Sequence, residues 1–173
     1  TSRAASDPAG TMQPVALLKS GEASYYKIIS GPFNRWGDFS ATAVDPSGNA
    51  MAVWYQHDGV RDSIYANRYA VGTGWDNAEL IETNNTGDAQ QPQVAVDPSG
   101  NATAVWFQWD GANDNVWANR YVVGTGWGTP ELIETNDTGS ARWPEVAVDP
   151  SGNAIAVWRH WDSMVENIWA NRY

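Results

Sequence analysis

Residues 97–102 read Asp-Pro-Ser-Gly-Asn-Ala, and the same six residues stand at 45–50 and again at 149–154. Consecutive copies begin 52 residues apart, without insertion. Pro, Ser, Gly and Asn are the residues that tight turns favour, and alternating apolar residues flank each copy. Each copy therefore predicts the tip of a β-hairpin, and the constant spacing predicts a repeat architecture.

The rest of the unit adds two further strands to this hairpin. In the middle copy we expect strands over residues 93–97, 102–108, 115–122 and 131–134. No stretch shows helical periodicity of useful length. The sequence therefore predicts an all-β fold whose unit is one β-propeller blade of four antiparallel strands, with about three blades at a period of 52. The alternative is a tandem of small β-sandwiches, but about 50 residues make only one sheet, which must bury both faces against neighbours.

The repeat also predicts the division of the chain. We expect a tail with a degenerate half-blade of strands three and four over 1–39, blade 1 over 40–82, blade 2 over 92–134, and blade 3 over 144–173 without its fourth strand. Since a closed propeller needs about four to eight blades, three blades would leave sheet faces bare. We expect a cyclic homodimer of six blades, or a higher assembly; the alternative is that the chain is part of a longer one.

Composition narrows the classes of partner. Ten basic and twenty acidic residues give a net charge of −10, which repels phosphate backbones and anionic lipid. No apolar run is long enough to cross a bilayer, and there is no cysteine for a disulfide or a thiolate metal site. We therefore expect neither nucleic-acid binding nor membrane insertion.

Two stretches of the middle unit carry a family resemblance. Residues 92–97 read Pro-Gln-Val-Ala-Val-Asp and residues 116–121 read Val-Trp-Ala-Asn-Arg-Tyr. With the turn between them, they resemble bacterial extracellular repeats of the β-propeller type, over residues 35–173. The resemblance implies propeller blades and a secreted or cell-surface location, and it implies little about activity.

Aromatic residues recur at fixed positions of the unit. One series is Trp54, Trp106 and Trp158, and the other is Tyr65, Trp117 and Trp169. Aromatic side chains at equivalent positions of inner strands pack between neighbouring sheets, so we expect both series in the interior. Trp75 and Trp127 differ, because each follows a Gly-Thr-Gly turn, where an indole is more easily exposed to a ligand.

A candidate sugar site combines each of these two indoles with an arginine and a glutamate. The first copy is Arg68, Trp75 and Glu79, and the second is Arg120, Trp127 and Glu131. In both copies the arginine precedes the glutamate by 11 residues, which places a bidentate donor and an acceptor on neighbouring strands. This set resembles the binding chemistry of fucose-binding propeller lectins. The alternative is a structural Arg–Glu pair that ties strands three and four together.

Acidic residues form a second recurring set, in the loop between strands two and three. The pairs are Asp58 with Asp62, Asp110 with Asp114, and Asp162 with Glu166. Together with backbone carbonyls, such pairs could hold Ca²⁺, which prefers several oxygen ligands. The alternative is turn capping by aspartate, since no full calcium-loop signature is present. No other cofactor is expected.

Three hypotheses of function follow, in decreasing order of support. The first is a secreted or cell-surface binding module of lectin type, with repeated carbohydrate sites. The second is a structural or assembly protein that forms a ring or filament. The third is a sialidase-like glycosidase, which would need an asymmetric set of acids at the ring centre, whereas the arginines here recur once per unit. We therefore expect no enzymatic activity and no catalytic residue.

Overall fold

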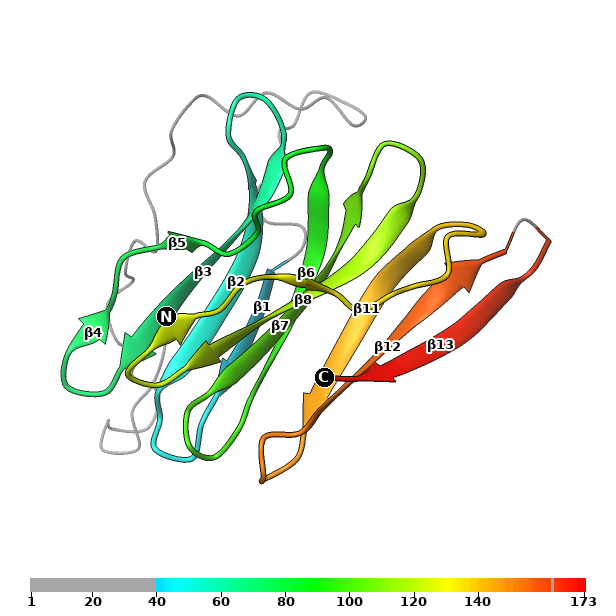
Figure 1. Cartoon of the computed structure of the whole chain (residues 1–173). Coiled ribbons are helices and arrows are strands. Elements are labelled where there is room, and N and C mark those ends of the chain that lie inside the picture. Colours follow the sequence, from blue (N-terminus) through cyan, green and yellow to red (C-terminus); the bar gives the residue numbers. More distant parts are fainter. Residues whose placement is uncertain (1–39, 163) are drawn as a thin grey trace, which may run out of the picture.

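The computed structural model describes residues 40–162 and 164–173, which form three antiparallel sheets (Figure 1). Sheet 1 contains β1 (Ser40–Val44), β2 (Ala50–His57), β3 (Asp62–Ala70), β4 (Gly74–Trp75) and β5 (Glu79–Leu80). Sheet 2 contains β6 (Ala89–Val96), β7 (Ala102–Trp109), β8 (Asp114–Val122), β9 (Gly126–Trp127) and β10 (Glu131–Leu132). Sheet 3 contains β11 (Ala141–Val148), β12 (Ala154–Trp161) and β13 (Glu166–Arg172). The predicted N-terminal half-blade lies outside the described residues.

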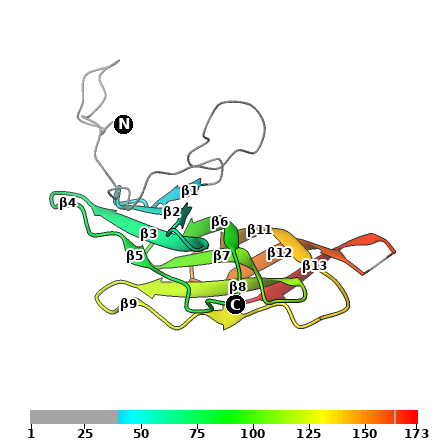
Figure 2. The same cartoon turned by 90° about the horizontal axis from the view of Figure 1, so that it is seen from above.

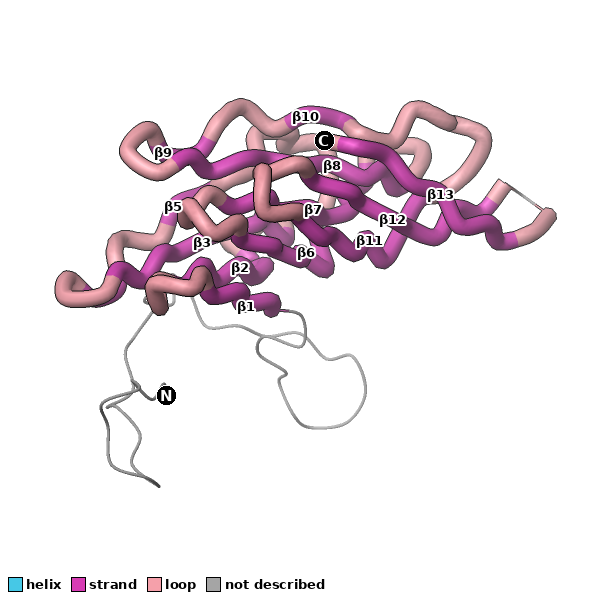
Figure 3. The backbone as a smooth tube through the Cα atoms, turned by 90° about the horizontal axis from the view of Figure 1, so that it is seen from below, coloured by secondary structure: helices cyan, strands magenta, loops and turns pink. Residues whose placement is uncertain are grey.

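The described chain is entirely strands and connections, as Figure 3 shows. The all-β prediction is therefore confirmed, and within the described ranges no helix is long and apolar enough to cross a membrane. In each sheet the strands pair in chain order, from the first to the third, as expected of hairpins joined by short turns.

The Asp-Pro-Ser-Gly-Asn turn closes the first hairpin of every sheet. In sheet 1, Asp45 Oδ1 accepts hydrogen bonds from the backbone N–H groups of Ser47 at 2.8 Å and Asn49 at 2.9 Å. Gly48 has φ +87°, a left-handed conformation that favours glycine. The same bonds and the same φ recur in sheets 2 and 3, so the turn motif explains why β2, β7 and β12 begin where they do.

The fourth strand differs from the prediction, because it is divided into two short pieces. Both β4 and β5 pair with β3, and both β9 and β10 pair with β8. At the break in sheet 2, Pro130 has no N–H to donate to a ladder. The Asn119 side-chain amide donates instead to the carbonyl of Gly128 at 3.1 Å, and Asn67 donates in the same way to Asp76 at 2.9 Å.

A bulge lengthens the first strand of sheets 2 and 3 toward the N-terminus. The register shifts between Gln90 and Gln93, and again between Arg142 and Glu145. Gln91 and Trp143 occupy the bulges with φ of 52° and 54°, values that non-glycine residues rarely adopt. β6 and β11 therefore begin at Ala89 and Ala141, before the positions that alternation alone predicts.

The three sheets stack face to face, as Figures 1 and 2 show. One cluster of buried residues joins sheets 1 and 2 and includes Met51, Val53 and Trp106. A second cluster joins sheets 2 and 3 and includes Val105, Val116 and Trp158. Each face of sheet 2 is thus covered by a neighbour, which confirms the predicted interior position of Trp106 and Trp158. The prediction is wrong for Trp169, which is 41% exposed.

Candidate functional site

The predicted arginines lie at the end of the sheets that carries the Asp-Pro-Ser-Gly-Asn turns. Arg120 Nη1 donates a hydrogen bond to the carbonyl of Gly152 in the turn of sheet 3, at 2.8 Å. Its Nη2 lies 3.8 Å from Asp97 Oδ2 of its own sheet. Arg120 therefore links sheet 2 to the turn of sheet 3, a contact between sheets that strand spacing alone does not predict.

The ladder register separates Trp75 from the rest of its predicted set. Glu79 pairs with Ala66, so it points to the same face of sheet 1 as Arg68, two positions further along β3. Trp75 pairs with Tyr69 and therefore points to the opposite face; the two rings meet edge to face at 5.6 Å.

The aromatic residues that face Arg68 come from sheet 2. The Arg68 guanidinium carbon lies 5.8 Å from the centre of the Tyr121 ring, and Tyr121 meets Trp127 edge to face at 5.7 Å. Both rings pack against the core between sheets 1 and 2. A candidate set at this end thus contains Arg68 and Glu79 from one sheet with Tyr121 and Trp127 from the next.

Between sheets 2 and 3, Tyr173 takes the place of Tyr121. Burial raises the pKa of Tyr173, the negative charge of Glu131 raises it further, and the positive charge of Arg120 lowers it. Tyr173 therefore lies near the predicted pair Arg120 and Glu131. The described residues contain no tryptophan equivalent to Trp127 at this second place, because the described chain ends at Tyr173.

The first acid of each predicted calcium pair caps its own turn. Asp110 Oδ1 accepts hydrogen bonds from the N–H groups of Ala112 and Asn113, both at 2.8 Å, and Oδ2 accepts one from Asn115 at 2.7 Å. These bonds lower the pKa of Asp110. The Oδ1 atoms of Asp58 and Asp162 accept equivalent hydrogen bonds from backbone N–H groups of their own turns. This pattern is the one that the capping alternative predicts.

The second acid of each pair has a different partner. The carboxylate of Asp62 accepts a hydrogen bond from Gln90, Asp114 pairs with Arg142, and Glu166 pairs with Arg159. Within residues 40–162 and 164–173, no group of three or more His, Cys, Asp or Glu side chains could hold a metal ion. Calcium binding by the six acids therefore stays a prediction.

Two buried glutamates, which the sequence did not single out, lie at the ends of β5 and β10. Glu82 and Glu134 are almost fully buried, and desolvation raises the pKa of both carboxyl groups. The hydrogen bond that the backbone N–H of Asn136 donates to Glu134 Oε1 partly offsets this effect. Because solvent does not reach them, these carboxyl groups influence stability and do not form a binding surface.

A pocket at the opposite end of the sheets combines aromatic and charged side chains. It lies between sheets 2 and 3, has a volume of about 350 Å³, and is lined by Phe107, Trp109, Asp114, Arg142 and Trp143, together with Asp88, Gln90 and Gln91. Trp109 and Trp143 are 38% and 44% exposed. This volume lies near the lower end of the range for small-molecule pockets, about 300 Å³.

The pocket presents its side chains in fixed positions. The Arg159 guanidinium carbon lies 4.4 Å from the centre of the Trp143 ring, a cation–π contact that restrains the indole. Arg142 forms an ion pair with Asp114, and its guanidinium carbon lies 5.9 Å from the Phe107 ring centre. Gln91 Oε1 is buried with no hydrogen-bond partner among the described residues. Aromatic faces and polar groups therefore meet in one cavity.

Sequence reasoning missed this pocket for a physical reason. The units place Gln91 and Trp143 at equivalent positions, so the indole breaks the repeat, and only the bulge directs it outward. A search for aromatic residues that interrupt the repeat would have found Trp143. The bulge itself has no clear sequence signal beyond the proline that follows it.

Comparison with known proteins extends these observations at the level of fold. No family model and no curated protein matches the chain. Among solved structures, an endo-arabinase from Bacteroides thetaiotaomicron VPI-5482 is similar, with TM-score 0.50 and 16% identity over 78% of this chain. The chain spans about half of that enzyme, 55% of its length. This likeness shows the fold alone, a propeller-like arrangement of antiparallel sheets.

Two further structures match less closely. A fucose lectin from Kordia zhangzhouensis aligns with TM-score 0.40 and 13% identity, over 75% of this chain and 96% of the lectin. A leech intramolecular trans-sialidase aligns with TM-score 0.44 and 13% identity, over 78% of this chain and 23% of the enzyme. The similar structures thus include both glycan-binding and glycan-processing proteins.

Proposed function

We propose that the protein is a carbohydrate-binding module, and that it holds one neutral sugar residue in the pocket beside Trp109 and Trp143. The observation that carries the proposal is the meeting of two half-exposed indoles with an Arg142–Asp114 pair in one cavity. A secreted or cell-surface location remains part of the proposal, based on the resemblance to extracellular repeats.

The chemistry of the pocket matches that of a sugar. An indole face packs on the apolar C–H face of a pyranose ring, while guanidinium, amide and carboxylate groups bond its hydroxyls. These groups are held by the protein before a ligand arrives, which reduces the entropy that binding costs.

Charge selects among sugars. The chain carries a net charge of −10, which disfavours anionic residues such as sialic or uronic acids. Arg142 is the pocket's cation, and its pairing with Asp114 leaves little net positive charge for a ligand carboxylate. A neutral hexose or deoxyhexose therefore fits this site better than an acidic one.

The predicted set at the other end of the sheets provides a second location for the same function. Arg68 there lies over the Tyr121 ring, Glu79 points to the same face of sheet 1 as Arg68, and Trp127 packs on Tyr121. Since Trp127 packs partly against the core, it offers less free indole surface than Trp143 does. The two locations lie at opposite ends of the sheets, so a single substitution at one of them tests that location without changing the other.

A glycan array screened with the whole chain, with and without Ca²⁺, tests the function. We expect binding to neutral glycans, and an array that stays blank in both conditions would overturn the proposal. Titration of the best ligand then tests the site: Trp143→Ala should weaken binding at least about tenfold, or about 1.4 kcal/mol. Trp161→Ala is the matched control, because Trp161 is a similarly exposed indole that does not line the pocket.

Two outcomes would change the assignment in distinct ways. Loss of binding in Trp127→Ala with full binding in Trp143→Ala would move the site to the turn end of the sheets. Hydrolysis of aryl glycosides by the chain would show an enzyme and replace the binding-module proposal.

A further inference from the structure

The outer face of sheet 3 carries exposed apolar side chains beside an Arg159–Glu166 ion pair, and it has no neighbour among the described residues. Ile155, Val157 and Ile168 on this face are 49%, 36% and 75% exposed. The residues 52 positions earlier, Thr103, Val105 and Val116, are 1%, 0% and 0% exposed, and those 104 positions earlier, Met51, Val53 and Ile64, are 2%, 0% and 0% exposed. The same face of the unit is thus covered in sheets 1 and 2 and bare in sheet 3.

The turn end of this face shows what a neighbour would contact. Between sheets 2 and 3, the turn glycine Gly152 lies so close to Asp97 and Arg120 that an added Cβ would be 2.9 Å from Asp97 Oδ2 and 2.7 Å from Arg120 Nη2. Between sheets 1 and 2, an added Cβ on Gly100 would be 3.1 Å from Asp45 Oδ2. In both interfaces the turn glycine of one sheet lies against the carboxylate of an aspartate in the preceding sheet.

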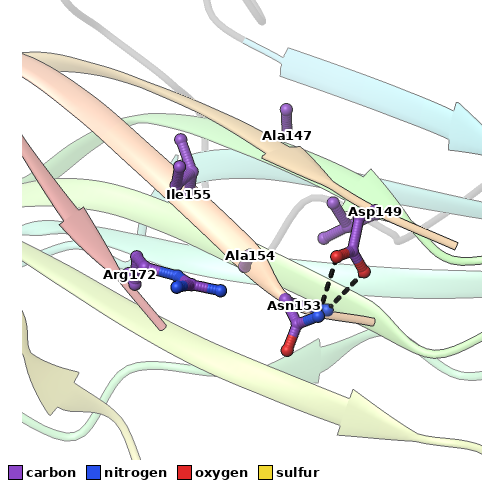
Figure 4. A pocket seen from close by; sticks show the side chains of 7 residues that line it. Ala147, Asp149, Asn153, Ala154, Ile155 and Arg172 are labelled. Carbon is purple, nitrogen blue, oxygen red and sulfur yellow. Dashed lines mark hydrogen bonds between the residues drawn. The ribbon is translucent and has the colours of Figure 1, made fainter. Parts of the chain in front are cut away.

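Sheet 3 carries the aspartate and the arginine of this contact but has no turn glycine from a further sheet against them in the described chain. Asp149 and Arg172 stand at the positions of Asp97 and Arg120, and Figure 4 shows them with Asn153, Ala154 and Ile155 around an open pocket of about 400 Å³. Asp149 Oδ2 accepts a hydrogen bond from the Asn153 side chain at 2.7 Å. Hydrogen bonds from Asn153 are the main cause that lowers the pKa of Asp149, and the positive charge of Arg172 lowers it a little further. No turn glycine from the described chain fills this pocket.

We propose that the outer face of sheet 3 binds sheet 1 of a second copy of this chain, with Gly48 of the second copy against Asp149 and Arg172. This goes beyond the proposed sugar binding and does not depend on it. We choose a second copy as the partner because the two interfaces inside the chain have the same form. In each of them, this face of one sheet packs against the next sheet along the chain, whose turn glycine lies against the aspartate of the first.

Sheet 1 has the complementary features. Gly48 has φ +87°, close to the +84° of Gly100 and Gly152, and an added Cβ would meet only Val71 Cγ2 within 4 Å among the described residues. Ala52 and Trp54 stand where Ala104 and Trp106 cover sheet 1 from sheet 2. Ala52 is buried in the single chain and Trp54 beside it is partly buried.

Two copies joined in this way at both ends contain six sheets, a number that a closed propeller-like ring permits. The contact is head to tail, because the two faces that meet are different. Closure at two copies removes every bare sheet face, whereas failure to close would give a filament.

The mass in solution tests the docking. Light scattering after size-exclusion chromatography should give twice 18.9 kDa for the whole chain after long incubation at high concentration. Ile168→Asp should shift it to 18.9 kDa, because it places a charge on the docking face and replaces a side chain that is 75% exposed in the single chain. Val60→Asp, at an equally exposed apolar residue in the loop after β2, should leave the dimer intact. A monomer at every concentration, or a dimer that Ile168→Asp leaves unchanged, would overturn the proposal.

Cross-linking tests the head-to-tail geometry. The chain has no cysteine, so introduced cysteines are unique. A short bis-maleimide linker should join two chains when Ser47→Cys and Ile155→Cys are combined in one chain, and should not do so with either substitution alone. Dimers cross-linked through Ile155→Cys alone would show a symmetric contact of sheet 3 with itself and would contradict the proposed occupant.

Discussion

Replacement of Gly152 by alanine tests the contact between a turn and the preceding sheet. Gly152 has φ +84°, and an alanine Cβ there would lie 2.7 Å from Arg120 Nη2 and 2.9 Å from Asp97 Oδ2. Gly124 is the matched control, because it has φ +83° and nothing within 4 Å of an added Cβ. Both variants adopt the same strained backbone, and only one of them clashes with a neighbouring sheet.

The expected magnitudes follow from these contacts. A left-handed conformation costs an alanine about 1 to 2 kcal/mol, which is the whole expected effect for Gly124→Ala. Gly152→Ala should also displace the Arg120 guanidinium from the Gly152 carbonyl, a charged hydrogen bond worth about 1.5 to 3 kcal/mol. The total for Gly152→Ala is then about 2.5 to 5 kcal/mol.

Urea unfolding followed by tryptophan fluorescence measures both values. The slope of the free energy against urea should stay constant if only native contacts change. If Gly152→Ala and Gly124→Ala destabilise the chain equally, within about 0.5 kcal/mol, the turn makes no stabilising contact with sheet 2, and the reasoning is refuted.

Two further predictions concern the buried carboxyl group of Glu134 and the turn acids. Burial raises the pKa of Glu134 above 4.5, so the folded state binds the proton of this carboxyl group more tightly than the unfolded chain does. The free energy of unfolding therefore falls as pH rises above about 4.5 and the carboxyl group loses its proton. Glu134→Gln should therefore gain stability relative to the wild type as pH rises above about 4.5 in urea titrations; a difference that stays flat with pH would contradict this. Asp110→Ala should cost about 1 to 3 kcal/mol through its lost capping bonds, and added Ca²⁺ should leave the thermal midpoint of the wild type unchanged. A midpoint that rises with Ca²⁺ and falls with a chelator would instead support calcium binding by the acid pairs.

The strand pattern was predictable because it depends on local chemistry. Turn residues at 97–101 and alternation along 102–108 lead directly to the hairpin of β6 and β7. The division of the fourth strand was not predictable in the same way. It depends on the Asn119 amide, which donates to the Gly128 carbonyl; asparagine recurs at this position of the unit, but its recurrence does not show which backbone carbonyl the amide binds.

The candidate site was less accessible to sequence reasoning, because it forms between units. Spacing within one unit associated Arg68 with Trp75, whereas alternation places Trp75 on the opposite face and Tyr121 of the next sheet opposite Arg68. The pocket beside Trp143 depends on a bulge with φ 54° and on a cation–π contact from β12. Stacked sheets bring together residues about 52 positions apart, and a single sequence does not show which faces meet.

The central claim is that successive sheets of the repeat bury their faces against each other, and a double-mutant cycle across sheets 1 and 2 tests it most directly. Val53→Ala and Trp106→Phe remove parts of two buried side chains in the same cluster without deleting either residue's apolar character. We predict a coupling energy of about 0.5 to 3 kcal/mol for this pair. Val53→Ala with Trp158→Phe, from separate clusters, should be additive. Strict additivity of Val53→Ala and Trp106→Phe would mean that the two sheets do not pack on each other, and would contradict the account.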